Sequence, residues 1–124
     1  MAYETKHFSQ TGDRLGCHCC GVGGASIALL ILLEMVRAHF GKPIKINSCA
    51  RCATNNLVVG GSKNSEHKST PDDPFSDACD FVVEGVHESK VVAYLKSLPF
   101  ANLLGIGKYK GRTHVDTRGY PARW

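Results

Sequence analysis

Apolar residues dominate one long segment, which runs from Ser26 to Phe40 and is followed by Gly41-Lys42-Pro43. Its length, its leucine-rich composition and the Gly and Pro at its end predict a helix that is buried on most of its faces. A second segment, Glu88 to Leu98, has apolar residues at helical spacing and ends before Pro99. We therefore expect one core helix and a second, shorter helix.

Shorter segments have the patterns of β-strands. They are either alternately apolar and polar or rich in β-branched and aromatic residues. Four such segments are found, at residues 43–48, 78–83, 105–109 and 112–116. The last two are predicted to be joined by a turn at Lys110-Gly111, whereas residues 55–68, which contain Gly60 and Gly61, are predicted to form an irregular loop. No internal repeat is present.

This order of elements predicts an α+β fold in which helices pack on a small antiparallel sheet. The chain has 124 residues and a mass of 13.4 kDa. We expect residues 1–124 to form a single domain, because this length supports one core and no second module. The composition, 43% hydrophobic and 21% charged, is that of a globular protein, and we expect a monomer.

Charge and hydropathy argue against two classes of partner. The net charge is +4, but the basic residues are scattered and form no run, so nucleic acid is not an expected partner. The apolar run from Ala25 to Leu33 is about half of the ~20 residues that a membrane span needs, so no stable membrane insertion is expected. The polar segment after Met1 has no signal-peptide pattern, which predicts synthesis in the cytoplasm.

The six cysteines allow two interpretations. Cys17, Cys20, Cys49 and Cys52 could together form a structural zinc site with four thiolates, as in a zinc-ribbon adaptor. The spacing of the first group and the charge of Arg51 inside the second do not favour that site. Small buried thiols that pack like apolar residues are the preferred interpretation.

Two segments that are far apart in the sequence carry the residues best suited to metal binding and catalysis. Ser65-Glu66-His67 is followed by Asp80 in a predicted strand, and His114 and Asp116 lie near the end of the chain. Two imidazoles and a carboxylate are the ligand set of a catalytic zinc site whose fourth position stays open. His114 and Asp116 are two residues apart on a strand, so they face the same side of the sheet. Each residue alone also has an ordinary interpretation, as a solvated histidine or a capping aspartate.

The order of these motifs resembles that of a known family over almost the whole chain. The motifs are His7-Phe8-Ser9, residues 40–48, Arg51, Asn64-Ser65-Glu66-His67, Ala78-Cys79-Asp80, Gly105-Ile106-Gly107, His114-Val115-Asp116 and residues 118–124. They resemble the zinc D-alanyl-D-alanine carboxypeptidase and endopeptidase superfamily, which also includes hedgehog N-domains. Within it, the chain is similar to the compact bacterial and phage peptidoglycan peptidases.

The resemblance implies a set of functional residues. His67, Asp80 and His114 would bind Zn²⁺ in a cleft on the sheet. Arg51 would bind a carboxylate of the substrate, since a guanidinium forms two parallel hydrogen bonds to such a group. Ser65 is also predicted to contact the substrate.

The chain departs from the family pattern at several positions. His67 and Asp80 are farther apart than in the family, which we interpret as an insertion at residues 70–75 and which makes Asp72 and Asp73 rival ligands. Ala50 replaces a tyrosine. The acidic residue that many relatives carry three positions before the last histidine is Gly111 here, so another residue must act as the general base. Asp116 is the preferred candidate, followed by Glu66 and Tyr109.

These features predict a zinc-dependent peptidoglycan peptidase that hydrolyses an amide bond in cell-wall stem peptides, either as a D-Ala-D-Ala carboxypeptidase or as an endolysin-type endopeptidase. We expect a bacteriophage lysis enzyme that acts on the cell wall after release from the host cytoplasm. The alternatives are a zinc-stabilised binding or virion structural protein without catalysis, for which the missing acid at Gly111 is the best support, and the zinc-ribbon adaptor.

Overall fold

The computed structural model describes residues 4–9, 13, 15–17, 23–51, 67–68 and 75–124. The elements follow the chain in this order: β1 (Gly24–Ala25), α1 (Ile27–Phe40), β2 (Ile44–Ser48), β3 (Phe75–Ser76), β4 (Ala78–Val83), α3 (Glu88–Ser97), the 3-10 helix η1 (Ala101–Leu103), β5 (Gly105–Tyr109), β6 (Arg112–Asp116) and β7 (Ala122–Arg123). The two helices and four longer strands confirm the elements expected from the hydrophobic pattern.

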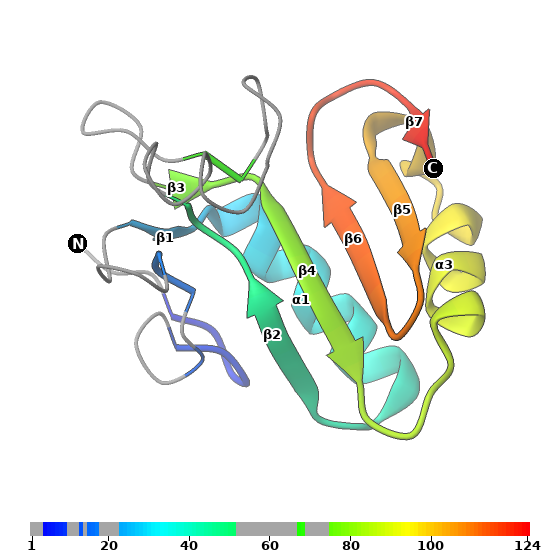
Figure 1. Ribbon diagram of the computed structural model, residues 1–124, viewed down its shortest axis with the longest axis horizontal. Coiled ribbons are helices and arrows are strands. Elements are labelled where there is room, and N and C mark those ends of the chain that lie inside the picture. The colour runs from blue at the N-terminus through cyan, green and yellow to red at the C-terminus, as the bar shows by residue number, and fades with distance from the viewer. Residues whose placement is uncertain (1–3, 10–12, 14, 18–22, 52–66, 69–74) are drawn as a thin grey trace.

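The main sheet has five strands in the order β2-β4-β6-β5-β7 (Figure 1). Neighbouring strands from β2 to β5 are antiparallel, as predicted, but β7 pairs with β5 in parallel, so the sheet is mixed. The sequence did not predict β7, because two residues are too few to show a strand pattern. A second, two-stranded parallel sheet joins β1 and β3. The α+β class with helices packed on a sheet is confirmed.

Helix α1 begins and ends at the residues that its sequence predicted. Ser26 is the N-cap, and its Oγ accepts a hydrogen bond from the Leu29 amide at 3.3 Å. Gly41 ends the helix with φ 63°, a left-handed conformation that glycine adopts without a steric penalty, and its amide donates to Arg37 O. Neither helix in the described ranges is long and apolar enough to cross a bilayer.

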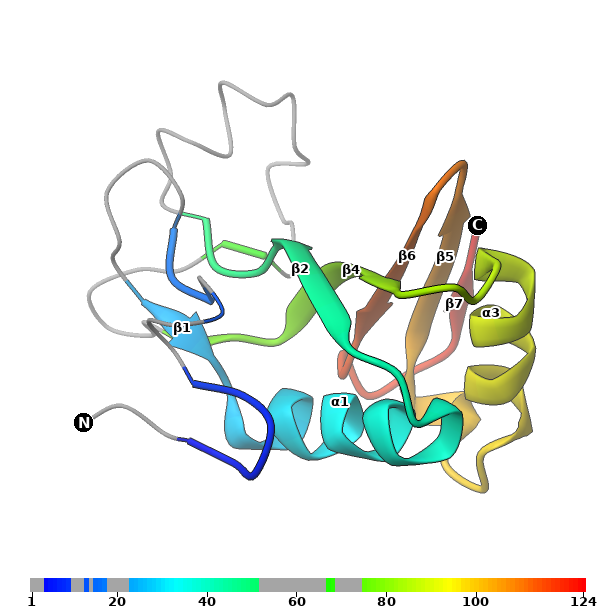
Figure 2. The same cartoon turned by 90° about the horizontal axis from the view of Figure 1, so that it is seen from below.

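The sheet has one covered face and one face that carries polar side chains. Helix α1 lies behind the sheet in Figure 1 and beneath β2 and β4 in Figure 2, and α3 runs alongside β5. Cys79, Phe81 and Val83 alternate along β4, are buried, and join the hydrophobic core with the apolar residues of both helices. Asp80 lies between Cys79 and Phe81, so it points to the opposite face. That face carries the candidate site.

Candidate metal centre

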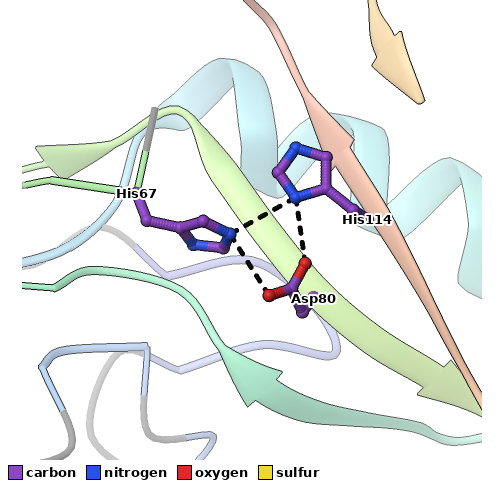
Figure 3. Close-up of side chains that lie close together, drawn as sticks. All are labelled: His67, Asp80 and His114. Atoms are coloured by element: carbon purple, nitrogen blue, oxygen red, sulfur yellow. Dashed lines mark hydrogen bonds and ion pairs between the residues drawn. The ribbon is translucent and has the colours of Figure 1, made fainter. Parts of the chain in front are cut away.

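Three side chains from distant parts of the sequence point toward one another on the polar face of the sheet (Figure 3). Asp80 on β4 and His114 on β6 are direct partners across antiparallel strands. His114 Nδ1 lies 2.9 Å from Asp80 Oδ1, and His67 Nε2 lies 3.3 Å from both Asp80 Oδ2 and His114 Nδ1. One ligand atom from each residue lies within 4.8 Å of the other two, a spacing that allows one metal ion to contact all three.

His67 is oriented by the chain that follows β2. Its Nδ1 lies 2.7 Å from the carbonyl oxygen of Cys49, and its own carbonyl accepts a hydrogen bond from the Arg51 amide at 2.8 Å. A carbonyl can only accept, so Nδ1 must carry the proton. In the neutral ring, Nε2 then presents its lone pair to Asp80 and His114.

His114 is oriented in the same way from its other side. Its Nε2 lies 2.7 Å from Asp116 Oδ2, and an ionised carboxylate can only accept a hydrogen bond. The proton of the neutral ring therefore belongs on Nε2, which leaves the lone pair of Nδ1 directed at Asp80 and His67. This carboxylate–histidine arrangement is the one that usually stands behind a metal-binding imidazole.

The two histidine tautomers and the Asp80 carboxylate place three acceptor atoms around one point. Acceptors without a donor between them repel one another, and a cation or a proton between them removes that conflict. Although burial opposes the ionised form, the adjacent rings of His114 and His67, when they carry a second proton, hold the pKa of Asp80 well below its ordinary value. Burial likewise opposes the charged form of His114, but Asp116 and Asp80 raise its pKa. The site therefore favours positive charge, and it fits a divalent metal with two nitrogen ligands and one oxygen ligand.

Asp116 is fully buried and surrounded by donors. Its Oδ1 accepts from the Gly105 amide at 3.2 Å, from the Arg118 amide at 3.2 Å and from Arg118 Nε at 2.7 Å, and its Oδ2 accepts from Arg118 Nη2 at 2.7 Å as well as from His114. Burial opposes ionisation, yet the hydrogen bonds from Arg118 and His114 keep the pKa of Asp116 well below its ordinary value. These contacts suit a residue that orients His114 and do not suit the general base that the sequence analysis preferred.

Two glycines on β5 provide the space for this arrangement. Gly105 is paired with Asp116 and Gly107 with His114 across the strands. A Cβ at residue 105 would lie 2.5 Å from Asp116 Oδ1 and 2.6 Å from Arg118 Nε. A larger residue at this position would displace the carboxylate or the guanidinium, so the Gly-Ile-Gly motif is required by the packing of the site.

Arg51 lies beside the three converging side chains. It forms a β-bridge with Lys68 and is partly buried, and its Nε is buried without a hydrogen-bond partner in the described part of the chain. Burial lowers the pKa of this guanidinium, and the nearby charge of Asp80 opposes that shift. A guanidinium that is partly exposed beside a cluster of possible metal ligands is suited to binding an anionic group.

Several predicted site residues lie outside the described residues: Ser65, Glu66, Asp72, Asp73, and Cys20 and Cys52 of the alternative zinc site. Most of the predicted insertion at residues 70–75 does so too. The remaining residues of the alternative site, Cys17 and Cys49, are buried. Burial and the neighbouring Cys49 thiol raise the pKa of Cys79 well above its ordinary value, as expected for a packed thiol.

Gly111, the position at which the resemblance to the family implied an acidic residue, lies in the turn between β5 and β6 with φ 83°. This left-handed backbone conformation disfavours any residue with a side chain. The turn therefore favours glycine over an acidic residue at this position.

The sequence analysis did not identify two further residues next to His114. Arg118 is the counter-ion of Asp116, and the ring of Trp124 lies 4.7 Å from the His114 ring, centroid to centroid. The two-residue spacing of Asp116 and Arg118 was the available signal for the first. The presence of a single tryptophan within the family-like motif at residues 118–124 was the signal for the second.

Comparison with known proteins identified one family. The sequence model described as Peptidase M15 matches residues 5–116, which include all three converging side chains. Searches of curated proteins and of solved structures found no match.

Proposed function

The chain belongs to the peptidase M15 family, and from this premise we propose that it is a zinc-dependent peptidase that hydrolyses an amide bond in peptidoglycan stem peptides. The observation that carries the proposal is the convergence of His67, Asp80 and His114, with each histidine tautomer set by a contact on its far side. Two imidazoles and one carboxylate form a common ligand set of catalytic zinc and leave a fourth position for water or substrate.

Each residue has a distinct role in the proposed reaction. When bound, zinc supplies the Lewis acid that polarises the scissile carbonyl and makes a water molecule more acidic. His67, Asp80 and His114 are the ligands, and Asp116 with Arg118 holds His114 in the metal-binding tautomer. The partly exposed guanidinium of Arg51 orients a carboxylate of the stem peptide. Ser65 is retained as a proposed contact with the substrate.

The biological setting is proposed from the same family relationship. A monomeric peptidase of this kind would act on the cell wall after release from the cytoplasm in which it is made, as a phage endolysin does. Both a carboxypeptidase and an endopeptidase fit the proposed ligand set and the proposed role of Arg51. The two differ in product, because a carboxypeptidase releases only the terminal residue of the stem peptide.

The test is to incubate the purified protein with peptidoglycan, with added zinc or with a chelator, and to identify the products by mass spectrometry. We expect zinc-dependent cleavage of the stem peptide and loss of both zinc and cleavage in H114A. His39 is exposed on α1 and stacks on Tyr94, so H39Q serves as a matched histidine control with wild-type activity.

Two results would contradict the proposal. Zinc binding without cleavage would favour the non-catalytic zinc protein, for which the absence of the acid at Gly111 is the specific support. Retention of zinc in H114A, with its loss in C49A, would favour the four-thiolate site.

A further inference from the structure

The indole of Trp124 lies on the polar face of the sheet, next to the candidate metal centre. Its ring is tilted by 47° against the His114 ring at a centroid distance of 4.7 Å. It occupies the space above Gly107, where a Cβ would lie 2.5 Å from the indole nitrogen. The side chain is 47% exposed. Trp124 therefore forms one wall of the candidate site.

The indole nitrogen connects this wall to Tyr109. Trp124 Nε1 donates a hydrogen bond to Tyr109 Oη at 2.6 Å. An indole N–H can only donate, so the phenol oxygen is the acceptor and its own proton is left to donate elsewhere. No acceptor for that proton lies among the residues whose positions are described.

Two further contacts place the Tyr109 ring. Tyr109 alternates with Gly105 and Gly107 along β5, so it lies on the same face of the sheet as the metal centre. The Arg112 guanidinium lies 4.3 Å from its ring centroid, a cation–π distance. Tyr109 and Arg51, the proposed carboxylate-binding residue, also lie within electrostatic range of each other.

We propose that the Tyr109 hydroxyl donates a hydrogen bond to the carbonyl oxygen of the scissile amide, and that Trp124 positions that hydroxyl. The inference rests on the proposed peptidase function. A pre-oriented donor aimed at the oxygen on which negative charge develops stabilises the transition state more than the ground state. Tyr109 would thus assist from β5, the strand next to His114, while Arg51 holds the other end of the substrate.

The test is a double-mutant cycle with Y109F and W124F. Y109F keeps the ring and its contact with Arg112 but removes the donor, so we expect kcat to fall by roughly 10²-fold with unchanged KM, zinc content and melting temperature. W124F keeps a ring against His114 but removes the indole N–H, so a smaller fall is expected. Because Trp124 acts through Tyr109, the double variant should be no slower than Y109F alone.

Tyr120 supplies the matched control. It is 57% exposed and its ring also has a guanidinium nearby, that of Arg118 at 5.5 Å, so Y120F removes a similar hydroxyl on a neighbouring surface. We expect Y120F to keep wild-type kcat. Trp124 is the only tryptophan, so its fluorescence gives a readout that is independent of catalysis. The emission should shift in Y109F and not in Y120F, both in zinc-loaded and in zinc-free protein.

Different results would overturn different claims. If the wild-type protein cleaves stem peptides and Y109F retains full kcat, the role of Tyr109 is wrong and the peptidase function stands. Multiplicative losses in the double variant would refute the positioning role of Trp124. A wild-type protein that binds zinc but never cleaves would overturn this inference together with the proposed function.

Discussion

Replacing Asp116 by Asn tests how the chain controls the tautomer of His114. The carboxylate has three donors at Oδ1 and two at Oδ2. The amide oxygen of Asn should therefore take the place of Oδ1, which puts the NH₂ group between His114 Nε2 and Arg118 Nη2. An amide NH₂ can only donate, so His114 must accept at Nε2 and carry its proton on Nδ1. That proton would occupy the atom that faces Asp80 and His67.

Two losses are expected in D116N. Removing one partner from a buried charge pair costs about 3 to 5 kcal/mol of stability. Removing the group that orients a metal-binding histidine costs about 10- to 100-fold in metal affinity. The second loss corresponds to about 1.4 to 2.8 kcal/mol of binding free energy. Competition with a zinc chelator measures the affinity, and thermal unfolding measures the stability.

Arg118→Met separates the two effects. This variant also breaks the buried pair of Asp116 and Arg118, so it should lose stability. It leaves the Asp116 carboxylate free to accept from His114 Nε2, so its zinc affinity should stay much closer to the wild-type value than that of D116N. Wild-type zinc affinity in D116N, or an equal loss of affinity in both variants, would refute the assigned tautomer.

Two further predictions concern the fold. Gly105→Ala places a Cβ 2.5 Å from Asp116 Oδ1 and 2.6 Å from Arg118 Nε, so we expect a loss of about 1 to 3 kcal/mol by chemical denaturation, and an unchanged midpoint would contradict the packing described for this strand. At Glu34, burial opposes ionisation, but hydrogen bonds from the His7 amide and ring, both at 2.6 Å, lower its pKa below the ordinary value of 4.5. The unfolded chain therefore binds more protons near that pH, so this contact stabilises the fold above pH 4.5 and is lost as the pH falls through the folded-state pKa. Glu34→Gln should remove that part of the pH dependence, measured by urea denaturation at several pH values, and an identical pH profile in the variant would show that the contact adds nothing.

The elements that the sequence predicted are those whose own residues determine them. Helix α1 combines a serine cap, a long apolar run and a glycine stop, and each of these acts locally. The hairpin of β5 and β6 has a two-residue turn with Gly111 at its left-handed position. The strands β1, β3 and β7 were missed because each has two residues and exists only through pairing with a distant segment.

The convergence of His67, Asp80 and His114 was predictable from the sequence, and the contacts around them were not. Alternation along a strand correctly placed His114 and Asp116 on one face, and their side chains lie 2.7 Å apart. It could not reveal that Arg118 saturates the same carboxylate, since that depends on how the chain turns after β6. For this reason Asp116 was predicted to be the base, whereas its contacts fit an orienting role. The contact of Trp124 with His114 likewise depends on the unpredicted parallel pairing of β7.

The packing of Trp124 on Gly107 in β5 should make these two positions vary together in evolution. The indole of Trp124 leaves no room for a Cβ at residue 107, so tryptophan at the first position requires glycine at the second. A homologue with a smaller group at the first position should tolerate alanine or serine at the second, and one that keeps tryptophan should keep glycine. Sequence variation at these sites is thus expected to be correlated, although they lie 17 positions apart (124 minus 107).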